Sequence, residues 1–126
     1  MSEAKDQRAT DRVKIPGGSV LYRKRNKFGL FDRFSKPMEL FNITKSGVCF
    51  KSDKLFHRGE VLLIEIIIPG EQSLRLLGVV KWIENPFSNH HTLIGAQFSA
   101  FGKGRDYNPI KSLERLRFIQ EKFSEL

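Results

Sequence analysis

The sequence predicts a mainly β protein: an antiparallel β-barrel with a flexible basic N-terminal arm and a C-terminal amphipathic α-helix. Three observations predict this fold class. Short runs rich in β-branched and aromatic residues recur between turn signals, which is typical of a closed or nearly closed antiparallel sheet. The first dozen residues are charged and have little apolar surface to bury. The last segment has apolar residues at helical spacing.

Length and composition limit the number of domains and the kinds of partner that the chain can have. A chain of 126 residues is expected to form one domain, and a formal charge of +8 attracts phosphates of any kind, in nucleotides, nucleic acids or anionic membranes. The single cysteine, Cys49, excludes an internal disulfide framework and is expected to be a buried small hydrophobe in a reducing cytoplasm. Neither a membrane span of about 18 to 20 apolar residues nor a signal peptide is recognisable, so we expect a cytoplasmic protein.

The chain divides into three parts. Residues 1–12 form the flexible arm, residues 13–105 the barrel and residues 106–126 the C-terminal helix. Turn-forming residues separate six apolar runs within the barrel segment, and each run has the length of a short strand. We therefore expect strands at about Ser19 to Arg25, Met38 to Ile43, Val48 to Lys51, Glu60 to Ile68, Leu74 to Glu84 and Thr92 to Ser99.

The fourth of these runs is apolar on both alternating faces apart from Glu65, so something outside the barrel is expected to cover its outer face. The C-terminal helix is the expected cover, with Asn108 available as its cap and Pro109 suited to its first turn. The alternative for this helix is a dimerisation face. Its apolar stripe comprises Ile110, Leu113, Leu116, Ile119, Phe123 and Leu126.

Two polar patterns indicate a site for an anionic nucleotide. In the arm, Arg8-Ala9-Thr10-Asp11-Arg12 supplies two guanidinium groups that can grip phosphates or a guanine edge through paired hydrogen bonds. Between two predicted strands, Asn42-Ile43-Thr44-Lys45-Ser46-Gly47 supplies an amide, a hydroxyl and a glycine that permits close backbone approach. Arg8, Arg12, Asn42, Thr44 and Gly47 are the candidate ligand-binding residues.

An RxxxR pattern followed by (Asp/Asn)-x-(Ser/Thr)-x-x-Gly resembles the signature of PilZ domains, small β-barrel receptors for cyclic di-GMP. Downstream, Leu77-Gly78-Val79-Val80-Lys81-Trp82 and Leu93-Ile94-Gly95-Ala96-Gln97-Phe98 are similar to late strands of that family. The resemblance implies that Arg8 and Arg12 clasp phosphates and a guanine edge, that Asn42 and Thr44 hydrogen-bond the ligand, and that Gly47 is the close-approach glycine. It further implies a bacterial second-messenger receptor whose arm orders on the ligand and changes a surface read by a downstream protein, with motility among the possible processes.

Two other functions stay open. Residues 22–36 interleave six cationic residues with three phenylalanines, and cations with aromatics on a β scaffold can bind single-stranded nucleic acid. Against this alternative, the rings can fold under Gly29 at a hairpin tip, and no RNP-like aromatic string occurs. The second alternative is a PilZ-like adaptor that binds proteins without the ligand.

The sequence favours neither catalysis nor a cofactor. His57 stands alone in a predicted turn, and His90 and His91 are adjacent, so they would point to opposite faces of an extended chain. No nucleophile elbow, P-loop or CxxC pattern occurs, and Glu65 is expected to face solvent or to pair with a lysine. We therefore predict a non-enzymatic protein whose ligand is cyclic di-GMP.

Overall fold

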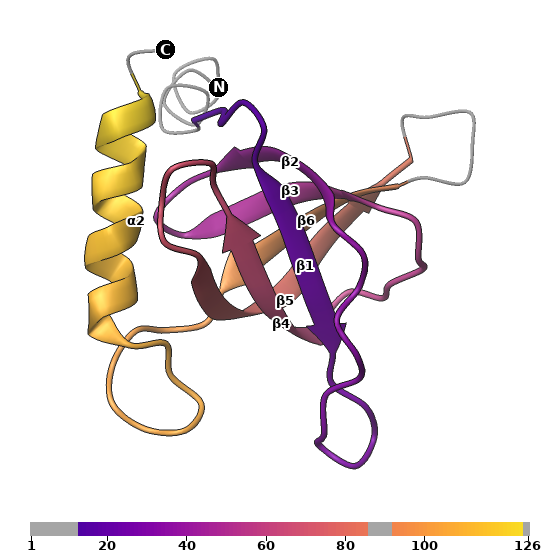
Figure 1. Ribbon diagram of the computed structural model, residues 1–126. Helices are drawn as coiled ribbons and strands as arrows, with labels where there is room; N and C mark the ends of the chain where they lie inside the picture. Colours follow the sequence, from indigo (N-terminus) through magenta and orange to yellow (C-terminus); the bar gives the residue numbers. More distant parts are fainter. Residues whose placement is uncertain (1–12, 86–91, 125–126) are drawn as a thin grey trace, which may run out of the picture.

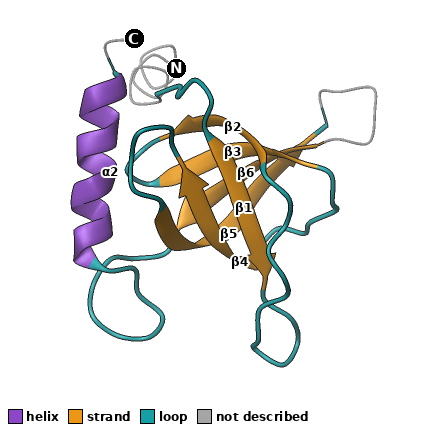
Figure 2. Cartoon of the chain, viewed as in Figure 1, coloured by secondary structure: helices purple, strands orange, loops and turns teal. Residues whose placement is uncertain are grey.

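A computed structural model describes residues 13–85 and 92–124 (Figure 1), and its β strands close into one antiparallel barrel in the order β1-β2-β3-β6-β5-β4. A helix follows the last strand and lies beside the barrel (Figure 2). Every predicted strand is present, and the ends differ by one residue at most, which confirms the predicted fold class. The elements are β1 Ser19–Lys24, β2 Met38–Ile43, β3 Gly47–Ser52, β4 Val61–Ile67, β5 Leu74–Glu84, β6 Thr92–Phe98 and α2 Ile110–Phe123.

Alternate residues of each strand fill the barrel interior, as the period-two pattern requires. On β4, the inward residues Leu62, Ile64 and Ile66 are completely buried, whereas the outward Glu65 pairs with Arg75 of β5 at 3.3 Å. Burying an aliphatic side chain of this size contributes about 1.5 to 3 kcal/mol, so these positions supply much of the stability. The predicted outward position of Glu65 is confirmed, although its partner is an arginine.

The barrel closes unevenly around β1. This strand pairs with β4 along six residue pairs but with β2 along only two. Ahead of β1, Val13 forms a bridge with Ile43 at the end of β2, in which each backbone N–H donates to the other residue's carbonyl at 3.1 and 3.0 Å. The chain is therefore fixed against the barrel from Val13 onward.

The helix packs on the barrel through part of its predicted stripe. Leu116 and Ile119 join the buried core and Phe123 packs against it, whereas Ile110 remains half exposed. The Glu71 carboxylate, in the turn between β4 and β5, forms ion pairs with Arg115 and Lys122 of α2. Packing of the helix on the barrel is confirmed for its middle and end. The strand that it contacts most is β5, and Ile67 on the outer face of β4 remains 37% exposed, so the helix does not cover that face as expected.

The predicted capping role of Asn108 is wrong. Pro109 occupies the N-cap position, and no side-chain hydrogen bond caps the helix. The buried Asn108 side chain instead accepts from the Leu77 N–H at 2.7 Å and donates to the Leu77 and Ser99 carbonyls at 2.9 and 3.0 Å. A buried amide gains more from satisfying three backbone groups, two of Leu77 within β5 and one of Ser99 just after β6, than from one cap bond, so it ties the start of α2 to β5.

The long connection between β1 and β2 forms a hairpin of its own, with an antiparallel bridge between Arg25 and Phe31. The expectation that its rings fold under Gly29 is wrong at the tip. Phe28 is 75% exposed, and nothing lies within 4 Å of where a Gly29 Cβ would be. Gly29 has a φ of 79°, so its role is to supply the left-handed backbone of the turn rather than space for a ring.

Candidate functional site on the outer barrel face

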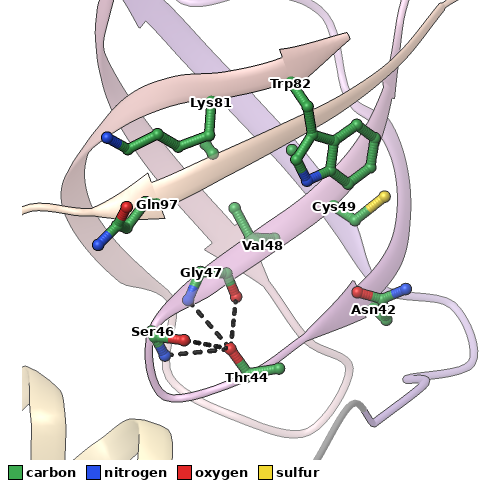
Figure 3. A pocket seen from close by; sticks show the side chains of 11 residues that line it. Asn42, Thr44, Ser46, Gly47, Val48, Cys49, Lys81, Trp82 and Gln97 are labelled. Carbon is green, nitrogen blue, oxygen red and sulfur yellow. Dashed lines mark hydrogen bonds between the residues drawn. The ribbon is translucent and has the colours of Figure 1, made fainter. Parts of the chain in front are cut away.

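A hollow of about 340 Å³ lies on the outer face of the barrel, where β3, β6 and β5 run side by side (Figure 3). Strand register forms its floor. Asn42 pairs with Cys49, Cys49 with Gly95, and Gly95 with Trp82, so these four residues make one row across β2, β3, β6 and β5. The volume falls within the range usual for small-molecule sites. Its lining residues are Asn42, Thr44, Ser46, Gly47, Val48, Cys49, Lys81, Trp82, Gly95, Ala96 and Gln97.

The Trp82 indole lies directly over Gly95. A Cβ added at Gly95 would stand only 2.0 to 2.4 Å from three atoms of that ring, so no other residue fits there without moving the indole. Figure 3 shows the indole beside Cys49. Together, the glycine and the register give the hollow an aromatic wall supported from below by the β6 backbone.

Thr44 organises the turn between β2 and β3. Its Oγ1 accepts hydrogen bonds from the backbone N–H groups of Ser46 and Gly47, both at 3.1 Å, and shares a third with the Ser46 hydroxyl at 3.0 Å (Figure 3). This is a local side-chain turn of the kind that Ser and Thr form. It fixes the polar rim of the hollow, and a ligand role for the Thr44 hydroxyl stays a prediction.

Gly47 is required by the protein's own packing. A Cβ at this position would lie 2.6 Å from the Ala96 carbonyl oxygen of β6. Since a backbone atom cannot yield as a side-chain tip can, any larger residue would push β3 away from β6. Close approach to a neighbouring strand therefore explains the glycine, whatever else binds above it.

The described lining of the hollow contains one cationic residue, Lys81, and no carboxylate. Lys81 lies at a register shift of β5 between Val80 and Trp82, where an extra residue interrupts the pairing with β6. Lys81 and Gln97 are both exposed, and Figure 3 shows their side chains near each other at one end of the hollow. These groups and the absence of nearby described negative charge favour an anion.

Arg8 and Arg12 lie outside the described residues. Asn42, Thr44 and Gly47 do come together at the hollow, but their sequence motif did not point to Trp82, Lys81 or Gln97. The sequence feature that could have indicated an aromatic wall is a tryptophan in one predicted strand and a glycine in the next, Trp82 and Gly95. Only the register of β5 with β6 places them against each other.

The described residues include no group of three or more His, Cys, Asp and Glu side chains that could hold a metal ion. The His57 side chain is 85% exposed and lies 3.4 Å from Glu60, while His90 and His91 lie outside the described residues. Cys49 is buried, as predicted. Among the described segments, no helix is long and apolar enough to cross a membrane.

Comparison with known proteins shows a likeness in structure. No family model and no curated protein matches the chain. A structure of K. pneumonia MrkH superposes with a TM-score of 0.64 at 13% identity, covering 89% of this chain and 47% of that one. A complex of MrkH with c-di-GMP gives 0.62 at 14% identity, covering 88% and 48%. The Bacillus subtilis inhibitor of motility, MotI/DgrA, gives 0.54 at 17% identity, covering 88% and 50%.

These matches define the class of fold. The chain is a PilZ-like antiparallel barrel followed by a helix, as predicted, and it spans about half the length of the solved structures it resembles. Identities this low establish the shared fold alone.

Proposed function

We propose that the hollow on the outer barrel face binds cyclic di-GMP and that the protein is a non-enzymatic receptor for it. The observation that carries the proposal is that Asn42, Thr44 and Gly47 of the (Asp/Asn)-x-(Ser/Thr)-x-x-Gly pattern line one hollow. Trp82 forms an aromatic wall of the same hollow, and Lys81 lies at its rim. A purine dinucleotide needs a flat apolar surface for a base and cations for its phosphates, and this hollow offers both. A solved MrkH–c-di-GMP complex with the same fold supports the choice of ligand.

Each group has a distinct role in this proposal. The Trp82 indole stacks on a guanine, the Asn42 amide hydrogen-bonds its edge, and Lys81 neutralises a phosphate. Arg8 and Arg12 close the site from the arm. The bridge between Val13 and Ile43 supports this role, because it fixes the residue that follows the arm opposite the neighbour of Asn42 in β2.

The arm provides the signal. Each charge-assisted hydrogen bond to a phosphate contributes about 1.5 to 3 kcal/mol, while ordering a residue's backbone costs roughly 1 to 2 kcal/mol. Several such bonds are therefore needed to hold residues 8 to 12 in place, and the ligand and the arm order together. The ordered arm then creates or hides a surface for a downstream protein partner.

Calorimetric titration with cyclic di-GMP at about 0.15 M salt tests this proposal, because screening at that ionic strength suppresses nonspecific attraction to a cationic protein. Arg12→Ala should weaken binding about tenfold or more, as expected for loss of a charge-assisted pair, and leave thermal unfolding of the free protein unchanged. Arg33→Ala, which removes an exposed charge from the hairpin, is the matched control and should bind normally.

Equal affinity of the Arg12→Ala and control variants would refute the closing role of the arm. If the wild-type chain bound no cyclic dinucleotide at all, the barrel would be a ligand-independent adaptor. Binding of nucleic acid by base stacking has less support, because guanidinium groups already cover two hairpin rings: Arg23 over Phe34 at 5.0 Å and Arg25 over Phe31 at 5.3 Å.

A further inference from the structure

The hairpin between β1 and β2 holds two large apolar side chains in solvent. Phe28 is 75% exposed and Leu30 is 65% exposed, and both belong to its terminal turn. The Asn26 carboxamide oxygen accepts from the N–H of Phe28 at 2.9 Å and of Leu30 at 3.1 Å, and the Gly29 N–H donates to the Asn26 carbonyl at 3.0 Å. These bonds define the conformation of the turn, and that conformation holds both side chains in solvent.

Phe28 has a cation–π contact only with its neighbour Lys27, at 5.3 Å, whereas the rings nearer the barrel contact cations of β1, β5 and the base of the hairpin. Phe34 lies between the guanidinium groups of Arg23 and Arg75, at 5.0 and 5.2 Å, and Phe31 lies under Arg25. Cation–π contacts of this kind stabilise the stem and hold the cations in place. The stem is thus packed, while the tip is left without an apolar partner among the described residues.

Charge around the tip is strongly positive. Residues 25–37 contain four cationic residues and one carboxylate, Asp32. Two cations flanking the hairpin have partners, since Lys24 pairs with Glu60 at 2.6 Å and Lys36 with Asp53 at 3.2 Å. Lys27 and Arg33 are exposed, and neither has an ion pair with a described residue. An apolar tip is therefore backed by cations on its own hairpin.

A third exposed apolar residue, Leu55, belongs to the connection between β3 and β4. Leu55 is 83% exposed, and it lines the same small cavity as Arg33 and Lys24 together with its neighbour Lys54. The connection between β3 and β4 therefore extends the cationic and apolar surface beside the hairpin.

We propose that this end of the barrel binds an anionic phospholipid surface, with Phe28 and Leu30 inserted at the level of the headgroups. An apolar element inserts about 5 to 10 Å into the boundary between headgroups and acyl chains, and basic residues behind it meet the anionic lipids. Phe28 and Leu30 supply the inserted part, and Lys27, Arg33 and Lys54 supply the charge. The hairpin is thereby a peripheral membrane contact.

The shape of the tip favours a bilayer over a folded partner. Stable protein interfaces bury about 800 Å² on each side and centre on anchors in fitted pockets, whereas this tip is a narrow convex turn with two apolar residues. A fluid lipid surface accepts such a turn without a complementary pocket. Leucine cannot stack on bases, so half of the exposed tip has no role in binding single-stranded nucleic acid.

The lipid contact and the proposed nucleotide site lie at different ends of the molecule. The bridge of Val13 with Ile43 precedes β1, and the hairpin follows it, so the six residues of β1, about 20 Å of strand, separate them. Figure 1 shows the hairpin tip below β1 and the start of the described chain above it. The proposal is therefore independent of cyclic di-GMP binding, and the two can fail separately.

Cosedimentation of the full chain with vesicles tests the lipid contact. Vesicles with about one third phosphatidylglycerol in phosphatidylcholine should bind the protein, pure phosphatidylcholine vesicles should not, and salt should weaken binding. The double variant Phe28→Ser/Leu30→Ser should lower the partition coefficient about tenfold or more. The matched control is Ile110→Ser/Phe118→Ser, which removes two half-exposed apolar residues of α2 and should bind like the wild type.

Unfolding temperatures show whether the tip variant is folded, and because both side chains are exposed we expect no change. Equal vesicle binding by the tip variant and the wild type would overturn the proposal, as would failure of the wild-type chain to bind the anionic vesicles. Binding of a short single-stranded RNA that depends on Phe28, without vesicle binding, would identify a nucleic-acid surface instead and equally overturn it. Phe28→Trp in a Trp82→Phe background adds a direct readout, since the single remaining indole then lies at the tip and its emission should shift to the blue only with anionic vesicles.

Discussion

Gly95 controls the position of Trp82, the aromatic wall of the hollow. A methyl group at Gly95 would overlap the indole, so Gly95→Ala should displace the ring from the β6 backbone. The chain has one tryptophan, which means that its fluorescence reports this side chain alone. We expect Gly95→Ala to shift the emission toward that of an exposed indole and to weaken cyclic di-GMP binding about tenfold, because a displaced ring loses its stacking contact.

Gly59→Ala is the control for the general effect of replacing a glycine. Gly59 has open space around its Cβ position, so its replacement introduces backbone strain at a φ of 91° without touching the indole. It should lower stability while leaving the Trp82 emission and the ligand affinity unchanged. Unaltered emission in Gly95→Ala would contradict the inferred packing of the ring on the glycine.

Two ion pairs join the hairpin end of the barrel to the connection between β3 and β4. Partial burial acts to raise the pKa of Glu60, but its hydrogen bonds to Lys24 and to the His57 backbone outweigh this effect, so its pKa lies below the ordinary 4.5. Partial burial likewise acts to raise the pKa of Asp53, and the Lys36 ammonium more than offsets it, so that pKa lies below 3.8. Both carboxylates are therefore held in their charged form in the folded chain.

The sign of the pH dependence follows from these lowered pKa values. A carboxylate with a folded pKa below its unfolded value stabilises the fold above the unfolded pKa, and this contribution is lost as pH falls through the folded pKa. We expect thermal stability to decline below about pH 4.5, and Glu60→Gln to flatten part of that decline. Glu84→Gln, at an exposed strand end, is the control. A profile for Glu60→Gln that parallels the wild type would show that the pair with Lys24 does not link the two elements energetically.

The sequence predicts those elements that form through contacts between residues close in the chain, and it fails for contacts between residues far apart in the chain. Alternating apolar residues and turn signals are local, and they predict all six strands. Asn108 was misassigned because an Asn-Pro pair before a helix has the local pattern of a cap, while its true partners, Leu77 and Ser99, come from the barrel. Trp82 was missed for a similar reason, since only strand register places it over Gly95.

Across the whole molecule, the barrel has one weak seam. β1 holds β2 through two residue pairs and β4 through six. On the weaker side the chain is also tied by the bridge between Val13 and Ile43 and by single backbone bonds, from the Leu40 N–H to the Gly18 carbonyl at 3.2 Å and from the Ser35 N–H to the Tyr22 carbonyl at 2.8 Å. Regions with few buried hydrogen bonds open locally at lower free energy than the core. The seam lies where the arm joins the barrel, so arm ordering and seam opening are expected to be coupled.

Amide hydrogen exchange measures this coupling residue by residue. In the free protein, the N–H groups of Val13 and Ile43 should exchange faster than that of Ile64, which lies in the fully paired β4. Saturating cyclic di-GMP should slow Val13 and Ile43 about tenfold, because a bound arm disfavours opening of the seam. The Gly29 N–H, at the hairpin, should be unaffected. If the ligand binds but protection appears at Gly29 and not at Val13 and Ile43, the hairpin rather than the arm transmits the signal, and the two ends of the barrel are coupled through β1.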